Sequence, residues 1–506
     1  MQIKGGEAIA AGGFGCVFRP PLKCSSKKST HNSSLKNNNM VSKLMIQKYG
    51  EEEYYETARF LDILEKIPKY DHYFLLPQGL CSPSALKSRD LINFDKKCNN
   101  LTRKNITSAN VNEKLEKLRI IQLYDGGIDL EKYISKETMT NEKLLLINKQ
   151  LVRLLKKAVI PMNHLGLYHF DLKASNIMMN EKNKTKIIDF GLSQYIEDFD
   201  EIPEDLTYRP CQYNLPATNI LFNNEFIEEY INFLKKHPIP SVGEIYTFVY
   251  NLYYSTLELE LGPGHFDFKK QVLRDYILEQ PKMSKNIIFT YISENLHTYT
   301  QNGNFDITNL FKHFLHNADV YGLLMSYIDM IHQNGVVWLN NDLKKTMQSE
   351  IRMLLKKYII NSSYELIDKE ECIKDIENLN SMILSRSSKK SIVTGKKSKH
   401  ISDTYSANTS KVKMSIKLSK IKSITKQMFT KTLSVNQNNI RTITERASSR
   451  RKTSKKSTKR TSGKKSNSQT LRTNRMSNNK TKKRKRCPNG TRRNKKTGNC
   501  EPYNRK

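Results

Sequence analysis

Two aspartates in the stretch 166–193, "GLYHFDLKASNIMMNEKNKTKIIDFGLS", stand beside short apolar runs typical of buried strands. Asp171 is followed by Lys173 and Asn176, and Asp189 opens "DFG" directly after "KII". The runs "NIMM" and "TKII" are joined by the polar residues "NEKNKT", a pattern that predicts a hairpin whose two ends meet. We therefore expect these four side chains to surround one cavity.

Residues of these types can together support phosphoryl transfer. That reaction needs a carboxylate that orients the attacking hydroxyl and accepts its proton, and a cation for the transferring phosphoryl group. It also needs oxygen ligands for Mg²⁺, which carboxylate and amide side chains supply. The residue types and their spacing thus predict a site for phosphoryl transfer.

Two upstream features can extend this site toward a nucleotide. Gly12, Gly13 and Gly15 in "AIAAGGFGCVF" predict a hairpin whose backbone comes close to phosphates, although glycines also serve hairpins for steric reasons alone. Lys43, flanked by apolar residues in "MVSKLMI", can reach phosphate oxygens. If Lys43 is considered without the other motifs, the alternative is a solvated lysine on an edge strand. Its expected carboxylate partner is Glu56, with Glu52 and Glu53 as alternatives.

The elements that must position these residues follow a simple order. Strands are predicted at 8–18, 40–46 and 118–124, and the segment "YFLLPQGL" is predicted as a further strand. Helical periodicity predicts helices at 51–67 and 142–166, and residues 82–114 are predicted as a polar loop insertion. From about residue 217 the pattern is mainly helical. Strands first and helices later indicate a small sheet lobe and a larger helical lobe.

With "HFDLKASN" and "DFG" 18 residues apart, and "AAGGFGCV" and "VSK" upstream in order, the chain resembles the eukaryotic-type protein kinase family over about residues 8–360. "ADVYGLL", with Asp319, is similar to the long central helix of that family's larger lobe. The lysine at position 173 is typical of the Ser/Thr branch. The resemblance implies an ATP- and Mg²⁺-dependent enzyme that acts on serine and threonine of protein substrates.

The resemblance also implies roles for single residues. Asp171 is the catalytic base, Lys173 contacts the γ-phosphate, and Asn176 and Asp189 hold Mg²⁺. Lys43, paired with Glu56, reaches the α- and β-phosphates, and "IIQLY" with the following turn supplies the hinge that binds adenine. The loop that covers ATP consists of Ala10, Ala11, Gly12, Gly13, Phe14, Gly15 and Val17.

Three departures from the family pattern stand out. Ala10 replaces the first glycine of the loop, and Phe170 replaces an arginine that normally grips a phosphorylated activation loop. From Phe170 we expect activity that does not depend on activation-loop phosphorylation. The Ala-Pro-Glu motif is replaced by "YRPCQYNLPATNILFN", with an insertion of about 100 residues before Asp319. This pattern is similar to kinases of large DNA viruses.

The charge of the chain is concentrated in its C-terminal part. The net charge is +35, and residues 383–506 hold 38 Lys and Arg against 3 Asp and Glu, so residues 1–382 are neutral. A segment so poor in large apolar residues cannot bury a core, which predicts a disordered basic tail. Its charge suits polyanions such as nucleic acid. The alternative is a solvated tail that has no dedicated partner.

The last residues, "RCPNGTRRNKKTGNCEP", place Cys487 and Cys500 on either side of two predicted turns. Two cysteines cannot complete a tetrahedral zinc site. The stretch resembles a viral two-cysteine adaptor module that brings fused enzymes to protein targets. The alternative is two incidental cysteines. The six other cysteines are scattered and predict no disulfide framework, which favours a reducing compartment.

The sequence therefore predicts an α+β bilobal protein-kinase-like fold at 1–382, a disordered basic linker at 383–484 and a two-cysteine motif at 485–506. No apolar run is long enough to span a membrane. We expect a virion protein, or one of the host cytoplasm or nucleus, that is not secreted. Two alternative functions remain open: a pseudokinase-like scaffold that binds through its tail, and a kinase-fold enzyme that phosphorylates a small molecule.

Overall fold

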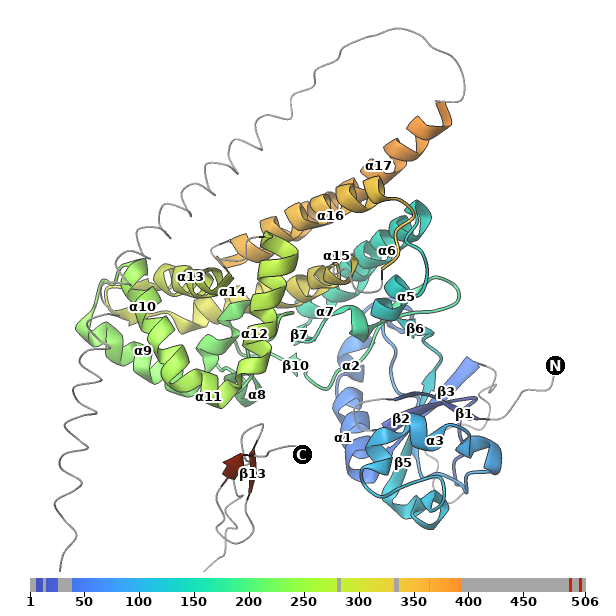
Figure 1. Cartoon of the computed structure of the whole chain (residues 1–506). Coiled ribbons are helices and arrows are strands. Elements are labelled where there is room, and N and C mark those ends of the chain that lie inside the picture. The colour runs from blue at the N-terminus through green and yellow to red at the C-terminus, as the bar shows by residue number, and fades with distance from the viewer. Residues whose placement is uncertain are drawn as a thin grey trace, which may run out of the picture. The chain divides into compact units, whose positions relative to one another are not determined.

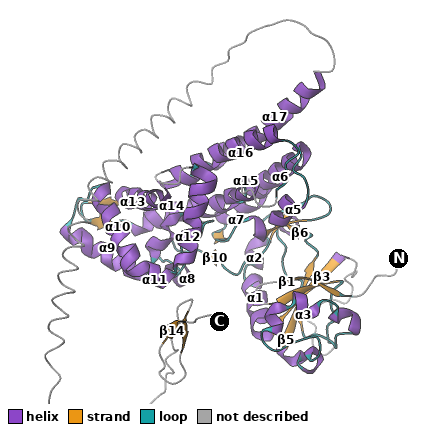
Figure 2. Cartoon of the chain, in the orientation of Figure 1, coloured by secondary structure: helices purple, strands orange, loops and turns teal. Residues whose placement is uncertain are grey.

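The computed structural model of the chain divides into two units, residues 1–432 and 433–506, which we describe separately. In the first unit a small β-rich lobe is followed by a larger helical lobe (Figures 1 and 2). This is the bilobal α+β architecture that the sequence predicts. The structure describes residues 6–11, 15–25, 39–279, 284–331, 336–363, 365–392, 491–493 and 500–502.

The small lobe is built on a five-stranded antiparallel sheet in the order β1-β2-β3-β5-β4. Its strands are β1 (Glu7–Ala11), β2 (Gly15–Arg19), β3 (Met40–Ile46), β4 (Gly79–Cys81) and β5 (Leu118–Tyr124). Strand β3 is central, and its Lys43 lies opposite Val17 of β2 and Ile121 of β5. The three predicted strands that carry the nucleotide-site residues are therefore confirmed.

The predicted strand "YFLLPQGL" is wrong for most of its length. Only its end, Gly79 and Leu80, joins the sheet, as part of β4. Phe74 instead forms an isolated bridge with Ile187 of the large lobe. Pro77 has no N–H to donate to a sheet ladder, so the segment crosses between the lobes rather than extending the sheet.

The predicted helix at 51–67 begins earlier and is broken. Helix α1 (Gln47–Ala58) starts directly after β3, and α2 (Leu61–Leu64) follows a break at Arg59 and Phe60. Phe60 departs from helical geometry, with φ −94° and ψ −4°, and its ring is buried in the main core. Burial of this ring therefore accompanies the break.

The segment 82–114 is not the polar loop that the sequence predicts. It forms short helices, among them α3 (Phe94–Lys97) and α4 (Asn99–Thr102), whose Phe94 and Leu101 are fully buried against the sheet. The disulfide Cys16–Cys98 joins β2 to the junction of α3 and α4, and a second disulfide, Cys24–Cys81, joins the residues after β2 to the end of β4, just before the segment. The expectation of no disulfide framework is wrong, because residues far apart in sequence meet in this lobe. Two disulfides in the small lobe do not support the expected reducing compartment.

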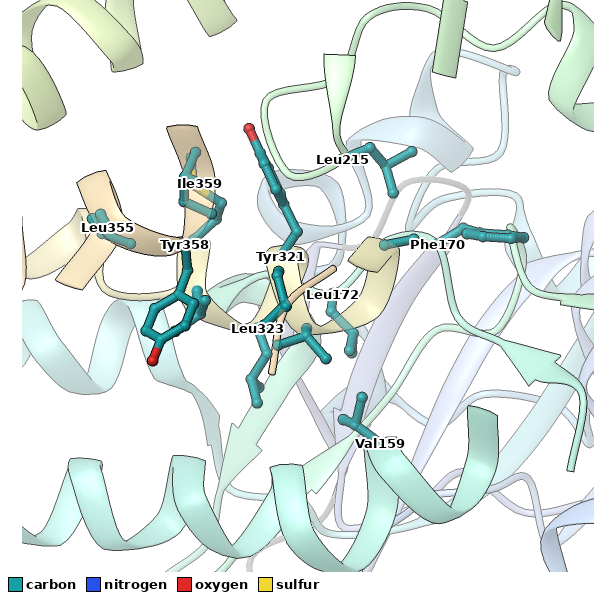
Figure 3. Close-up of a cluster of buried hydrophobic side chains, with 14 of the residues drawn as sticks. Val159, Phe170, Leu172, Leu215, Tyr321, Leu323, Leu355, Tyr358 and Ile359 are labelled. Carbon is teal, nitrogen blue, oxygen red and sulfur yellow. The ribbon is translucent and has the colours of Figure 1, made fainter. Parts of the chain in front are cut away.

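The large lobe is organised around helix α14 (Ile307–Met325), which is buried along almost all of its second half. Against it packs the segment 155–159, which continues α6 (Asn141–Leu154), and Asn163 of α7 (Ile160–His164) donates to its Asp319. Helix α6 itself packs against α17. The core here is rich in aromatic and branched side chains. Figure 3 shows Phe170, Leu172 and Leu215 in one buried cluster with Tyr321 and Leu323 of α14.

Two small sheets of short strands lie in the large lobe and carry the candidate site residues. Strands β6 (Ile128–Asp129), β8 (Ile177–Met179) and β9 (Thr185–Ile187) make one sheet, and β7 (Leu167–Tyr168) pairs with β10 (Gln194–Tyr195). The pairing of Ile177 with Ile187 confirms the predicted hairpin between "NIMM" and "TKII". The strand ends that carry the polar residues therefore meet.

The remaining helices form most of the large lobe, as predicted from residue 217 onward. They are α5 (Leu130–Lys136), α8 (Glu204–Thr207), α9 (Asn224–Lys236), α10 (Val242–Leu252), α11 (Glu258–Leu261), α12 (Pro263–Gln271), α13 (Ser284–Thr298), α15 (Ile328–Ile331), α16 (Asn341–Leu355) and α17 (Lys369–Ile392). Helix α17 continues past residue 382 and buries Ile383 against the core. None of the helices within the described ranges is long and apolar enough to cross a membrane.

In the second unit, β13 (Thr491–Arg493) pairs antiparallel with β14 (Cys500–Pro502), and Arg493 lies opposite Cys500. Cys487 lies outside the described residues, as do residues 393–484 of the linker predicted at 383–484, whereas residues 383–392 belong to helix α17.

Candidate active site

The loop that carries Asp171 is fixed from below by Asp319 of α14. The backbone N–H groups of His169 and Phe170 donate to the Asp319 carboxylate at 2.8 and 2.9 Å, and the Asn163 amide donates to it at 2.7 Å. Phe170 has a φ of 56°, a strained conformation for a residue with a side chain. A buried carboxylate that accepts several hydrogen bonds can hold such a turn.

Helix α14 can approach this loop closely because of Gly322. A Cβ on that residue would lie 2.8 Å from the carbonyl oxygen of Leu172, too close for any real contact. The central helix therefore supports the loop directly through the backbone.

Three side chains surround the carboxylate of Asp171, which is itself buried. Lys173 Nζ donates to both oxygens, at 3.0 and 2.8 Å, and Asn176 Nδ2 donates to Oδ2 at 2.9 Å. Asn214 Nδ2 donates to Oδ1 at 2.9 Å. The structure thus brings together the predicted trio of Asp171, Lys173 and Asn176 and adds Asn214. Sequence reasoning missed Asn214, although it lies in the unusual motif "YRPCQYNLP".

Asp189 follows β9, the second strand of the hairpin, and lies close to the Asp171 loop. The N–H of Ile188 donates to the Asn176 carbonyl oxygen at 3.0 Å, and His169 Nε2 lies 3.0 Å from the Ile188 carbonyl oxygen. Asp189 has a φ of 67°, which turns it away from the direction of the preceding strand, and its carboxylate is exposed. The four residues of the predicted constellation therefore lie on adjoining backbone segments.

The donor set fits a magnesium ion. The nitrogen of the Asn176 amide is engaged by Asp171, so the amide oxygen is the atom available to a cation. Within the described ranges no hydrogen bond to that oxygen occurs. Together with the exposed carboxylate of Asp189, it provides the hard oxygen ligands that Mg²⁺ prefers.

Phe190, next to Asp189, joins the two lobes through an aromatic column. Its buried ring lies 5.1 Å from His169, 5.9 Å from Phe74 and 6.3 Å from Phe60, measured between centroids. Phe60 comes from the break between α1 and α2, and Phe74 from the crossing segment. Packing of these rings ties the position of α1 to that of the Asp171 loop.

Lys43 pairs with Glu53, and the predicted pairing with Glu56 is wrong. Lys43 Nζ lies 2.7 and 2.6 Å from the two carboxylate oxygens of Glu53 on α1. Because α1 begins right after β3, the turn that contains Glu53 faces the strand. Glu56, three residues on, points toward the "DFG" turn: a Cβ on Gly191 would lie 3.8 Å from its carboxylate. Burial raises the pKa of Glu56, and the nearby Arg59 opposes that rise.

The predicted nucleotide loop is described only in part. Gly12, Gly13 and Phe14 lie outside the described residues. Ala10 pairs with Val17 and Ala11 with Cys16 across β1 and β2, and Val17 lies opposite Lys43. At Gly15 a Cβ would lie 2.2 Å from the carbonyl oxygen of Leu44, so this glycine permits close contact between β2 and β3. Of the two roles that the sequence allows for these glycines, Gly15 therefore has the steric one.

Phe170 is buried rather than facing the activation segment. Its ring stacks between Tyr168 and Phe314, with centroids 5.6 and 5.7 Å away. The guanidinium of Arg209, also buried, lies 5.4 Å from the same ring. Arg209 donates to the carbonyl oxygens of Phe170 at 3.3 Å and Leu192 at 2.9 Å, so it bridges the Asp171 loop and the segment after "DFG".

Comparison with known proteins gives a consistent result. Residues 92–212 match the protein kinase domain family, a region that includes Asp171 and Asp189 but not Lys43. A probable serine/threonine-protein kinase of Dictyostelium discoideum is 31% identical over 121 residues, which is 23% of this chain and 12% of that protein. Another from the same organism, mkcE, is 33% identical over 120 residues, 22% of this chain and 16% of that protein.

The chain thus spans less than a fifth of the length of these relatives. The matched region holds the hairpin, the "DFG" turn and the loop that Asp319 supports. The two-lobed arrangement of the chain is consistent with this match. Residues 92–212 are therefore similar to the protein kinase domain family, and the fold is protein-kinase-like.

Proposed function

We propose that this chain transfers the γ-phosphoryl group of ATP to serine and threonine hydroxyls of protein substrates. The observation that supports this best is the set of contacts around Asp171. Its carboxylate is buried and held by Lys173, Asn176 and Asn214, while the loop that carries it is held by Asp319. A base fixed in this way can orient a hydroxyl before proton transfer.

The neighbouring side chains have complementary tasks in this proposal. Asp171 accepts the hydroxyl proton, and Lys173, at 2.8 Å, keeps positive charge beside the transferring group. Lys43, oriented by Glu53, faces the nucleotide phosphates. Asn176 and Asp189 would hold Mg²⁺, which when bound neutralises charge that builds up on the phosphate oxygens.

A transfer assay with the full chain tests the proposal. Labelled ATP, Mg²⁺ and a basic protein substrate should give labelled serine or threonine, identified by mass spectrometry. Asp171→Asn should lower the rate by roughly two orders of magnitude or more, because general-base catalysis and positioning are both lost. Glu181→Gln, a carboxylate-to-amide change on an exposed hairpin residue, is the matched control. Equal rates for wild type and Asp171→Asn would exclude the assignment.

The same assay, combined with melting temperatures measured with and without Mg·ATP, separates this proposal from its alternatives. A scaffold without activity would give no product, and Mg·ATP would not raise its melting temperature, whereas a nucleotide-binding chain gains stability by linkage. A small-molecule kinase would bind Mg·ATP but leave protein substrates unlabelled.

We further propose that activity does not require a phosphorylated activation segment. The contacts of Arg209 support this, because they join the Phe170 and Leu192 carbonyls without a phosphate. Phosphatase treatment should leave the rate nearly unchanged, and a large fall would contradict the proposal.

We also propose a viral origin, a protein-docking role for the C-terminal motif and nucleic-acid binding by the basic tail. The motif "YRPCQYNLP" and the two-cysteine end support an origin in a large DNA virus. The strand pair β13–β14 is compatible with a small adaptor that docks a protein. Localisation to a virion or to the host cytoplasm or nucleus, and binding of nucleic acid by the basic tail, rest on charge alone.

A further inference from the structure

The segment 208–216, "YRPCQYNLP", lies between the loop of Asp171 and the helical insertion, and we refer to it as the bridging segment. Most of it is shielded from solvent: Arg209, Cys211, Asn214 and Leu215 are all buried. Figure 3 shows Leu215 in the same buried cluster as Leu172, the residue after Asp171. The bridging segment is therefore a packed part of the core next to the catalytic loop.

Asn214 is the contact between the bridging segment and the candidate base. It is 1% exposed, and its Nδ2 donates to Asp171 Oδ1 at 2.9 Å and to the Leu172 carbonyl oxygen at 3.1 Å. Asn176 donates to the other oxygen of Asp171. Two amides thus hold the two oxygens of one carboxylate from opposite sides, which fixes the rotation of its plane.

Lys269 of helix α12 holds the bridging segment from the insertion side. Its Nζ donates to the carbonyl oxygens of Gln212, at 3.0 Å, and of Leu215. These two carbonyls flank Asn214 in the chain. The ammonium also lies 5.2 Å from the centroid of the Tyr321 ring of α14. Helix α12 therefore clamps the backbone on both sides of the residue that contacts Asp171.

The environment of this lysine is costly for a charged group. Lys269 is 1% exposed, and among the described residues it forms no ion pair with a carboxylate. Burial lowers its pKa to about 8. Where only packing is needed, an apolar side chain of similar length would avoid the cost of burying an ammonium ion. What the lysine adds is a fixed pair of donors for two carbonyls.

We propose that Lys269 is a positioning residue for phosphoryl transfer, acting on Asp171 through the backbone at 212–215 and the side chain of Asn214. The inference rests on the proposed function. It gives the helical insertion at 217–316 a role that the sequence leaves open: one of its helices sets the geometry of the base from outside the catalytic loop.

This arrangement makes a specific kinetic prediction. Asp171 faces the acceptor hydroxyl, while Lys43 and Glu53 on the small lobe face the nucleotide. Loss of the clamp should therefore lower kcat and leave the KM for ATP nearly unchanged. A role limited to stability would lower the fraction of folded enzyme and shift no kinetic constant of the part that remains folded.

The test uses the full chain and four variants. Lys269→Met should lower kcat about tenfold, with the KM for ATP changed by less than about twofold. Lys270→Met is the matched control, since Lys270 follows on the same helix but pairs with Asp267 instead. Asn214→Ala should lower kcat at least as much. In the double variant the two losses should not multiply, because both act through one contact.

Each outcome bears on the inference. An unchanged kcat in Lys269→Met, or losses that multiply fully with those of Asn214→Ala, would overturn it. Should Lys269→Met melt below the assay temperature, Lys269→Gln takes its place, because the shorter glutamine side chain removes the buried charge and keeps a polar amide at this position. A multiplicative result with that variant overturns the inference equally. A wild-type chain that transfers no phosphate would instead overturn the proposed function, so the two failures are distinguishable.

Discussion

At the scale of single residues, the pairing of Lys43 illustrates how one helical turn decides a contact. Glu53 and Glu56 are three residues apart on α1, and both precede buried residues at helical spacing. Spacing to Phe60 favours Glu56, and Phe60 does pack against Phe190. The start of α1 immediately after β3 nevertheless turns Glu53 toward the strand, and Glu56 toward Gly191.

This geometry predicts different effects for two conservative changes. Glu53→Gln should lower kcat/KM for ATP by roughly tenfold, because a charge-assisted contact to Lys43 is replaced by a neutral one. Glu56→Gln should have a clearly smaller effect. Steady-state rates at varied ATP concentration give both values. A larger loss in Glu56→Gln would mean that α1 rotates when the enzyme works.

Asp329 on α15 predicts a dependence of stability on pH. Burial raises the pKa of its carboxyl from 3.8 to about 7, and the nearby carboxylates of Glu131 and Asp129 add to the rise. Between these two values the folded chain binds the proton more strongly than the unfolded chain. This group therefore contributes stability at low pH that is lost as the pH rises through about 7.

Asp329→Asn removes that titration. The melting temperature of the variant relative to wild type should increase with pH across the window from 3.8 to about 7, and then level off. Asp198→Asn, an exposed aspartate, should show no such trend. A difference between Asp329→Asn and wild type that is constant over this range would contradict the assignment.

At the scale of elements, the two disulfides have the clearest consequence. Cys16–Cys98 and Cys24–Cys81 span 82 and 57 residues of sequence. Cys16–Cys98 fixes the 82–114 segment to the sheet that carries Lys43, and Cys24–Cys81 fixes the strand end at which that segment begins. The segment also contributes its own buried residues, so its attachment completes the core of the small lobe.

Loss of one of these bonds should destabilise the small lobe. The variant Cys16→Ser with Cys98→Ser should lose about 2–5 kcal/mol of unfolding free energy under oxidising conditions. Denaturant titrations with and without dithiothreitol measure this, and a chain in which all four cysteines are replaced should not respond to the reductant. If wild type also failed to respond, these cysteines would not be paired in solution.

At the scale of the whole molecule, charge and fold are separated along the chain. Residues 393–506 contain 35 of the 85 Lys and Arg and 3 of the 50 Asp and Glu. Helix α17 extends to Ile392, and Ile383 within it is buried at 1% exposure. A truncation that preserves the folded body should therefore end at 392 rather than at the charge boundary at 382.

The full chain should bind DNA and RNA without base preference, and the chain 1–392 should not. Because binding releases counterions from many phosphates, affinity should fall by orders of magnitude over a few-fold rise in salt. Fluorescence anisotropy with unrelated oligonucleotides at several salt concentrations measures this. Deletion of 487–506 should leave most of the binding in place, because most of the basic residues remain. Strong binding by 1–392 would move the site into the two-lobed body.

Much of the catalytic constellation could be predicted from local sequence alone. The hairpin of β8 and β9 follows from alternating apolar and polar runs, and it necessarily brings Asn176 and Asp189 close together. Spacing of two to five residues places Asp171, Lys173 and Asn176 on one loop. The order of strands and helices likewise gives the two lobes, because these patterns depend on near neighbours in the chain.

Tertiary structure alone decided the contacts between distant segments. The choice of Glu53 over Glu56, the disulfides of the 82–114 segment, and the approach of Asn214 and Lys269 to Asp171 all join residues whose partners no local pattern identifies. These contacts are specific because a buried polar group must form a hydrogen bond. Its partner is whichever group the fold brings close, and that group can be far away in sequence. Local sequence thus determined which polar groups share the candidate site, and the packing of distant segments, including the insertion against α14, determined what holds them.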